Sequence, residues 1–152
     1  MTLRTSLFFP FLLLGAALVA GCASSSSSPP LNFGDASVNN LWYQLETRRH
    51  AGDLDQALIY ADKLIELHST KAREQQASLS AYPVKDVYNY HTLNQVGLTF
   101  LVKGDMLKEK GDKDGAREAY NTLIRDFSYA QHGTVDEFFK AAEDAKERLK
   151  DL

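Results

Sequence analysis

Apolar residues recur at helical spacing on both sides of a short break at Gly111 and Asp112. No proline interrupts residues 98–110. Glycine tolerates the left-handed backbone that ends a helix, and aspartate accepts backbone hydrogen bonds where the next helix begins. The pattern predicts two antiparallel helices that approach closely at the small residues Gly104 and Ala116. The positions on the apolar stripe are Phe100, Leu101, Gly104, Leu107, Ala116, Tyr120, Leu123, Ile124 and Phe127.

An earlier pair of helices follows the same plan around Gly52 and Asp53. Asp53 and Gln56 have the spacing of a capping box, which marks the start of a helix. Gly52 and Ala57 have the same separation as Gly111 and Ala116, which lie 59 residues later. We therefore expect a second hairpin. Its apolar positions are Val38, Leu41, Trp42 and Leu45 before the turn, and Leu54, Ala57, Leu58, Ala61, Leu64 and Ile65 after it.

The later hairpin resembles a tetratricopeptide (TPR) repeat in four residues, Gly104, Gly111, Ala116 and Tyr120. The earlier hairpin is a degenerate match. Glu46 stands where a glycine is usual, and Trp42 and Leu45 align only if the turn is one residue short. The resemblance implies an all-α, right-handed solenoid of antiparallel TPR-like hairpins, with five to six helices and a C-terminal capping helix in residues 37–152.

The two turns are separated by about 25 residues more than the TPR period of about 34 residues. One interpretation lengthens the two inner helices to residues 53–81 and 84–110, with a tight turn at Tyr82 and Pro83. The alternative is a separate short helix with a disordered loop. In the first interpretation the tip of a projecting arm exposes aromatic side chains suited to a partner or to self-association. They are Tyr82, Tyr88 and Tyr90.

The C-terminal part of the chain predicts a loop and one last helix. Residues 128–133 form the loop, and Thr134 and Glu137 have the spacing of a capping box. The predicted helix has a strongly charged opposite face, as expected of a helix that caps a solenoid. Its apolar face consists of Val135, Phe138, Phe139, Ala142 and Leu149.

Residues 1–21 have the pattern of a secretory signal, with Arg4 before an apolar run from Leu7 to Ala20. The segment ends in Leu18-Val19-Ala20-Gly21 followed by Cys22, the only cysteine. This resembles the lipobox of bacterial lipoproteins and implies a lipid on Cys22; the alternative is a plain signal peptide. Ala23 after the cysteine implies sorting to the outer membrane. The serine- and proline-rich residues 22–36 predict a tether that holds the domain near the membrane, facing the periplasm.

Charge and residue spacing argue against several classes of function. The formal net charge of −3, without a basic cluster, is unlike that of a nucleic-acid-binding protein. The four histidines lack metal-ligand spacing, and the aspartates after Gly52 and Gly111 are explained as helix caps. We expect no catalytic residue, no metal and no cofactor.

The resemblance to TPR proteins implies a binding surface on the first helix of each hairpin. It would use Asn39, Trp42, Glu46 and Arg49, followed by Leu101, Asp105 and Lys108. We therefore expect a lipid-anchored, non-enzymatic adaptor that binds another protein of the cell envelope, such as assembly, secretion or cell-wall machinery. The alternative is a small envelope enzyme, or its accessory subunit, that acts on polysaccharide or peptidoglycan.

Overall fold

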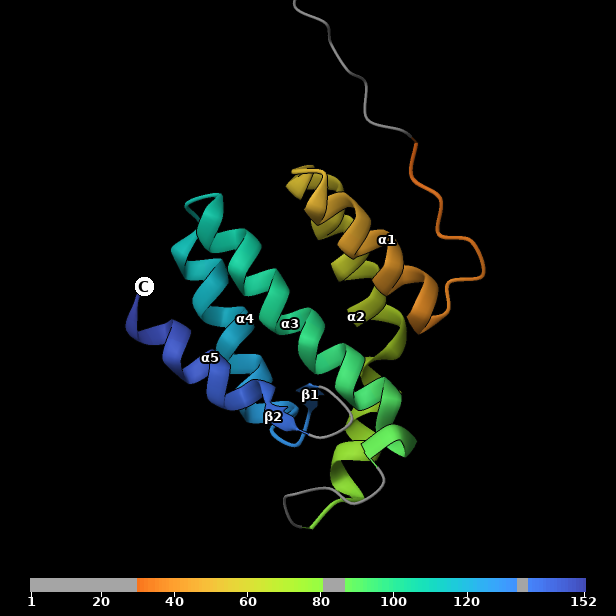
Figure 1. Ribbon diagram of the computed structural model, residues 1–152, viewed down its shortest axis with the longest axis vertical. Coiled ribbons are helices and arrows are strands. Elements are labelled where there is room, and N and C mark those ends of the chain that lie inside the picture. Colours follow the sequence, from red (N-terminus) through yellow and green to blue (C-terminus); the bar gives the residue numbers. More distant parts are fainter. Residues whose placement is uncertain (1–29, 81–86, 134–136) are drawn as a thin grey trace, which may run out of the picture.

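The computed structural model describes residues 30–80, 87–133 and 137–152, and it is mostly helical (Figure 1). This confirms the predicted helical class. Helices α1 (Val38–His50) and α2 (Leu54–Ala77) form one hairpin, and α3 (His91–Glu109) and α4 (Lys113–Asp126) form another. The 3₁₀ helix η1 (Val87–Tyr90) precedes α3. Strands β1 (Gln131–Gly133) and β2 (Phe138–Lys140) precede the last helix, α5 (Ala141–Lys150).

The two hairpin turns have the same geometry. Gly52 and Gly111 both adopt positive φ values, 75° and 85°. In each turn the next residue, an aspartate, donates its backbone N–H to a carbonyl five residues earlier and caps the following helix with its side chain. The turn of the first hairpin is therefore not one residue short. Leu45, rather than Glu46, occupies the position that corresponds to Gly104.

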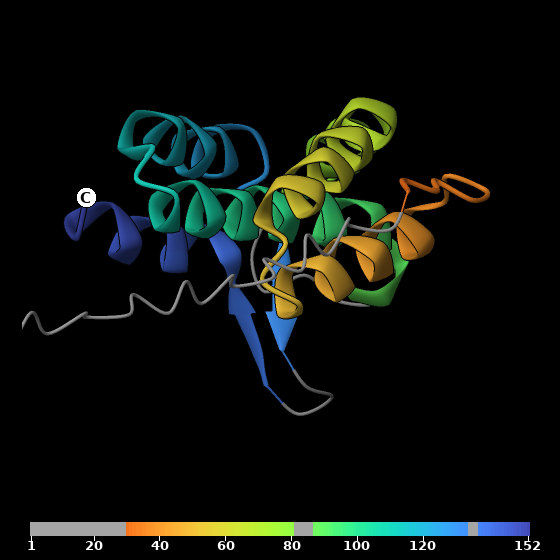
Figure 2. The same cartoon turned by 90° about the horizontal axis from the view of Figure 1, so that it is seen from above.

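The helices form two layers (Figure 2). Helices α1, α3 and α5 lie in one layer, and α2 and α4 lie in the other. The β1–β2 hairpin extends from the first layer, away from α2 and α4. Aromatic and aliphatic side chains from both layers fill the core between them. The largest fully buried apolar residues are Tyr60, Tyr120, Phe127, Leu41, Leu45, Leu64, Leu93, Met106, Leu123 and Val96.

Small residues on α3 allow close packing, as predicted. A Cβ atom added to Gly104 would overlap the ring of Tyr120, and one added to Gly97 would overlap Ala130. Ala116 is fully buried at the start of α4. Gly104 thus leaves room for the Tyr120 ring, and Gly97 leaves room for Ala130 in the segment after α4.

The long insertion does not form the predicted arm with few internal contacts. Helix α2 ends at Ala77 and α3 begins at His91, so both are shorter than predicted. The end of α2 is tied to the segment after α4, because Gln76 donates to Ser128 Oγ and accepts from the backbone N–H of Tyr129. It is also tied to the start of α3, because Gln75 accepts from the backbone N–H of Leu93. η1 is closer to the alternative of a separate short helix.

The C-terminal prediction is wrong at the start of the last helix. Phe138 and Phe139 belong to β2, which pairs antiparallel with β1 in a segment predicted to be a loop. Side chains alternate along β2, so Phe138 is half-buried whereas Phe139 is 46% exposed. Fully buried Ala130 and Ala141 join the two strands to the core through a backbone hydrogen bond of 3.1 Å. Thr134 and Val135 lie outside the described residues.

The segment before α1 contacts α2 within the range predicted as a tether. The hydroxyl of Tyr60 donates to the backbone oxygen of Asn32 and accepts from its N–H, at 3.1 and 2.9 Å. The ring of Phe33 packs edge-on against Tyr60, and Nε2 of His68 lies 2.9 Å from the backbone oxygen of Ala36. These contacts determine where the chain leaves the helical domain. Cys22 lies outside the described residues.

Candidate functional site

Charged side chains from α1, α3 and α5 lie near one another. We call this set, which consists of Glu46, Arg49, Asp105, Glu109 and Arg148, the charged face. Nη2 of Arg49 lies 2.6 Å from Oε2 of Glu46. The hydrogen bonds that Arg49 donates to the Glu46 carboxylate raise the pKa of Arg49, and the charges of Asp105 and Glu109 act in the same direction. Nε of Arg148 lies 2.8 Å from Oδ1 of Asp105. The ion pair between Asp105 and Arg148 therefore links α3 to α5, and Arg49 of α1 lies within the electrostatic reach of α3.

Four of the residues predicted to bind a partner, Glu46, Arg49, Asp105 and Lys108, are partly exposed on α1 and α3. The first three belong to the charged face. Sequence reasoning missed Arg148, because its partner Asp105 lies 43 positions earlier in the chain.

The remaining predicted residues differ in accessibility. Leu101 is only 4% exposed and packs in the core, so its assignment to a binding surface is wrong. Trp42 is partly buried against the core, and Asn39 is exposed with its Oδ1 2.6 Å from Nε2 of His91. Leu101 and Trp42 thus serve packing, whereas Asn39 is exposed.

The predicted aromatic tip is only partly covered by the structure. Tyr82 lies outside the described residues, and the described part of Tyr88 is limited to its backbone in η1. Tyr90 is partly buried and packs against the core at the start of α3. Tyr90 therefore contributes to the fold where an exposed tip was predicted.

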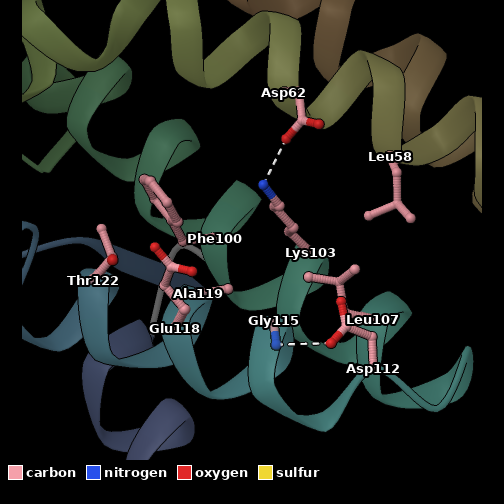
Figure 3. A pocket seen from close by; sticks show the side chains of 10 residues that line it. All are labelled: Leu58, Asp62, Phe100, Lys103, Leu107, Asp112, Gly115, Glu118, Ala119 and Thr122. Atoms are coloured by element: carbon pink, nitrogen blue, oxygen red, sulfur yellow. Dashed lines mark hydrogen bonds and ion pairs between the residues drawn. The ribbon is translucent and has the colours of Figure 1, made fainter.

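A groove on the second layer runs between α2 and α4 above α3 (Figure 3). Its volume is about 330 Å³. Lys103 at its edge pairs with Asp62 at 2.6 Å, and the Asp112 carboxylate accepts from the backbone N–H of Gly115 at 2.9 Å. Asp62 and Asp112, two of the three acidic residues of the lining, are thus engaged in ordinary structural contacts. The apolar lining consists of Leu58, Phe100, Leu107 and Ala119.

A second cavity lies between α3 and the β1–β2 hairpin, and we call it the slot. Its volume is also about 330 Å³. Gln95 Oε1 and Gln131 Nε2 are buried without a hydrogen-bond partner in the part of the chain that the structure describes. The slot is lined by His91, Asn94, Gln95 and Leu98 of α3, and by Gln131, His132, Gly133 and Phe138 of the hairpin.

The hairpin wall of the slot is held in place from two sides. The backbone N–H of Gln131 donates to Oδ1 of Asn94 at 2.9 Å, which fixes β1 against α3. Nε2 of His132 lies 2.6 Å from Oδ2 of Asp144 on α5, and its ring packs against Phe139 across the strand pair. The slot therefore has a defined shape. The polar residues His91, Asn94 and Gln95 on α3 were its only sequence signal.

The described residues contain no group of three or more His, Cys, Asp or Glu side chains arranged to hold a metal ion. Across residues 30–80, 87–133 and 137–152, no helix has both the length and the apolar character needed to cross a membrane. No protein-family model, curated protein or solved structure matches this chain.

Proposed function

We propose that this protein is a lipid-anchored adaptor of the bacterial outer membrane, with TPR-like hairpins that bind another envelope protein on the periplasmic side. The observation that carries the proposal is the charged face. Partly exposed charged side chains of α1, α3 and α5 gather in the first layer, where Asp105 pairs with Arg148 and the charges of Asp105 and Glu109 act on Arg49. Charged surfaces of this kind favour selective protein encounter, because complementary charges steer the partner and like charges reject others.

The sequence supports the anchoring part of the proposal. Cys22 follows a secretory apolar run, and a serine-rich segment separates it from the helical domain. The contacts of Asn32 and Phe33 with Tyr60 leave about ten residues between Cys22 and the domain. Ten residues span at most about 35 Å, so the domain would stay close to the membrane surface.

Two features support the TPR-like assignment. The hairpins repeat the same turn geometry with the same aspartate caps, and Gly104 receives an aromatic side chain from the following helix. In such an arrangement, the first helices of successive hairpins share a surface that can hold a partner. That surface is the one that carries the charged face.

Site-specific photocrosslinking in intact cells tests the adaptor function. A photoreactive residue at Lys108, beside the charged face, should capture one abundant envelope protein. The same residue at Glu118, in the groove between α2 and α4, tests the opposite layer, and an exposed position on α2, Lys71, is the control. Capture from Glu118 alone would move the docking surface to the second layer. Absence of any protein adduct at both Lys108 and Glu118 would overturn the adaptor proposal.

A further inference from the structure

We propose that the groove between α2 and α4 binds a basic amphipathic helix of another protein. The apolar face of that helix packs on the floor of the groove, and a lysine or arginine beside this face pairs with Glu118. The site goes beyond the proposed function, because helical periodicity places the floor residues Phe100 and Leu107 on the side of α3 opposite Asp105 of the charged face.

Three helices enclose the groove, and side chains close one of its ends. Helices α2 and α4 both pack on α3, and Figure 3 shows the lining side chains that the three helices contribute. At one end the ring of Phe127 stacks on Phe100, with 5.3 Å between the ring centres. Arg73 of α2 spans that end, because its guanidinium lies 5.5 Å from the centre of the Phe127 ring and its Nη2 lies 3.8 Å from Oδ2 of Asp126. The groove is therefore bounded in length.

The floor of the groove matches the repeat of an amphipathic helix. Phe100 and Leu107 lie seven residues apart on α3, about 10 Å at 1.5 Å per residue. That length equals two turns of a partner helix, so apolar residues at positions i, i+3 or i+4, and i+7 of the partner reach along it. Leu58 and Leu107 are only partly buried, and Ile59 beside the α2 wall is 42% exposed. Apolar surface is therefore available on the floor and at one wall.

An extended peptide fits this groove less well than a helix does. The walls and the floor are helices, whose backbone N–H and C=O groups are paired within each helix. An extended segment would bury its own backbone groups against apolar side chains without hydrogen-bond partners, which costs free energy. A helix pairs its backbone internally and presents only side chains to the groove.

The charges of the lining favour a basic partner. The described lining contains one basic residue, Lys103, and three acidic residues, Asp62, Asp112 and Glu118. Lys103 pairs with Asp62 at 2.6 Å, and Asp112 caps α4. A basic helix therefore meets an acidic excess in the groove, whereas an acidic helix would be repelled.

Glu118 is the acidic residue that remains for a partner. It forms no salt bridge with any residue in the described ranges 30–80, 87–133 and 137–152. Its charge acts on Arg125, but Arg125 pairs with Asp126 at 2.6 Å. Figure 3 shows the Glu118 carboxylate extending from α4 toward Phe100, at the edge of the apolar floor. A lysine or arginine beside an apolar stripe thus gains an opposite charge at this position.

Nuclear magnetic resonance of the purified full chain, with ¹³C-labelled leucine methyl groups, tests the inference with defined peptides. The probe is a blocked peptide of two Lys-Leu-Ala-Ala-Leu-Lys-Ala repeats, in which helical spacing places the lysines on both sides of a leucine stripe. The basic probe should shift the signals of Leu58 and Leu107 and leave those of Leu149, on α5, unchanged. A control peptide with glutamate at every lysine position should bind several-fold more weakly. A second control, with proline at the centre of each repeat, cannot form the helix and should not bind.

Reversal of the charge at Glu118 separates this contact from general attraction between a basic peptide and an acidic protein. Glu118→Lys should weaken binding of the basic peptide several-fold and strengthen binding of the glutamate peptide. Glu147→Lys, at an exposed position on α5, makes the same change in net charge and should leave both affinities unchanged. If Glu118→Lys disturbs the fold, Glu118→Gln still tests the site, because it should weaken the basic peptide alone.

Three results would overturn the inference. They are the absence of shifts at Leu58 and Leu107, equal binding of the lysine and glutamate peptides to the wild-type chain, and an equal loss of affinity in Glu118→Lys and Glu147→Lys. Shifts of the groove signals with protein concentration, without any peptide, would also overturn it and assign the groove to a second copy of this chain.

Discussion

The ring of Tyr120 occupies the space that a side chain at Gly104 would need. The Tyr120 hydroxyl then donates to the carboxylate of the next residue on α3, Asp105, at 2.7 Å. Asp105 also pairs with Arg148 of α5. A single close approach between α3 and α4 therefore positions an acidic residue of the charged face. Packing in the second hairpin and the geometry of the proposed docking surface are coupled through this contact.

Gly104→Leu should destabilise the fold by about 1–3 kcal/mol, because the added side chain must displace the buried Tyr120 ring. Urea denaturation followed by circular dichroism measures the change. Ala77→Leu is the matched control, since Ala77 is exposed at the end of α2 and should change stability by less than about 0.5 kcal/mol. Equal stability of both variants would show that the hairpin does not rely on this close approach.

The Tyr120→Phe variant should lose less stability than the wild-type protein as the pH rises above about 10. Burial, followed by the hydrogen bond to Asp105, raises the pKa of Tyr120 above its ordinary value of about 10. Above pH of about 10 the unfolded chain therefore releases this proton while the folded chain retains it. The stabilisation is present below that pH and is lost as the pH rises towards the folded-state pKa.

Denaturant midpoints between about pH 8 and 11 measure this effect. Tyr43, which is 66% exposed, provides the control, and Tyr43→Phe should keep the wild-type slope. At neutral pH, Tyr120→Phe should lower the free energy of unfolding by about 1 kcal/mol, the value of one hydrogen bond. The loss stays this small because Asp105 still pairs with Arg148. An alkaline slope unchanged by Tyr120→Phe would contradict the assignment.

Gln76→Leu should destabilise the protein by about 1–3 kcal/mol. The backbone N–H of Tyr129 and the hydroxyl of Ser128 would both lose their hydrogen bonds to Gln76. Thermal unfolding measures the change, and the neighbouring surface substitution Glu74→Gln is the control. A Gln76→Leu variant as stable as wild type would mean that the end of α2 is not anchored by this residue.

Cys22→Ser should release the protein from membranes if the proposed lipid anchor is correct. The wild-type chain should incorporate labelled palmitate and sediment with the outer membrane, because acyl chains on one cysteine contribute about 0.8 kcal/mol per buried CH₂. The variant should remain as an unprocessed precursor or a soluble periplasmic form. Wild-type protein found soluble in the periplasm would contradict the anchor.

Local interactions explain which parts of the fold could be predicted from the sequence. The aspartates after Gly52 and Gly111 cap their helices within three residues, and each glycine supplies a positive φ at a tight turn. Such preferences act over a few positions, so the residue types alone indicate them. For the same reason the sequence indicated the two hairpin turns.

Long-range contacts decided the rest. Thr134 and Glu137 have the spacing of a capping box, yet Phe138 and Phe139 form a strand with Gln131–Gly133. Pairing with a second segment and attachment to α3 through Asn94 outweigh the helical preference of this segment. Leu101 likewise lies on a predicted binding face, but the packing of α3 against its neighbours buries it.

The sequence by itself determined the helices, their caps and the turns that join them, because these depend on residues within one or two helical turns of each other. Only the tertiary structure decided that Arg148 reaches Asp105 and that Gln95 faces the same slot as Gln131. Those residues are 36 or more positions apart along the chain. Their proximity arises from the stacking of whole helices and from a strand pair, which no local spacing specifies.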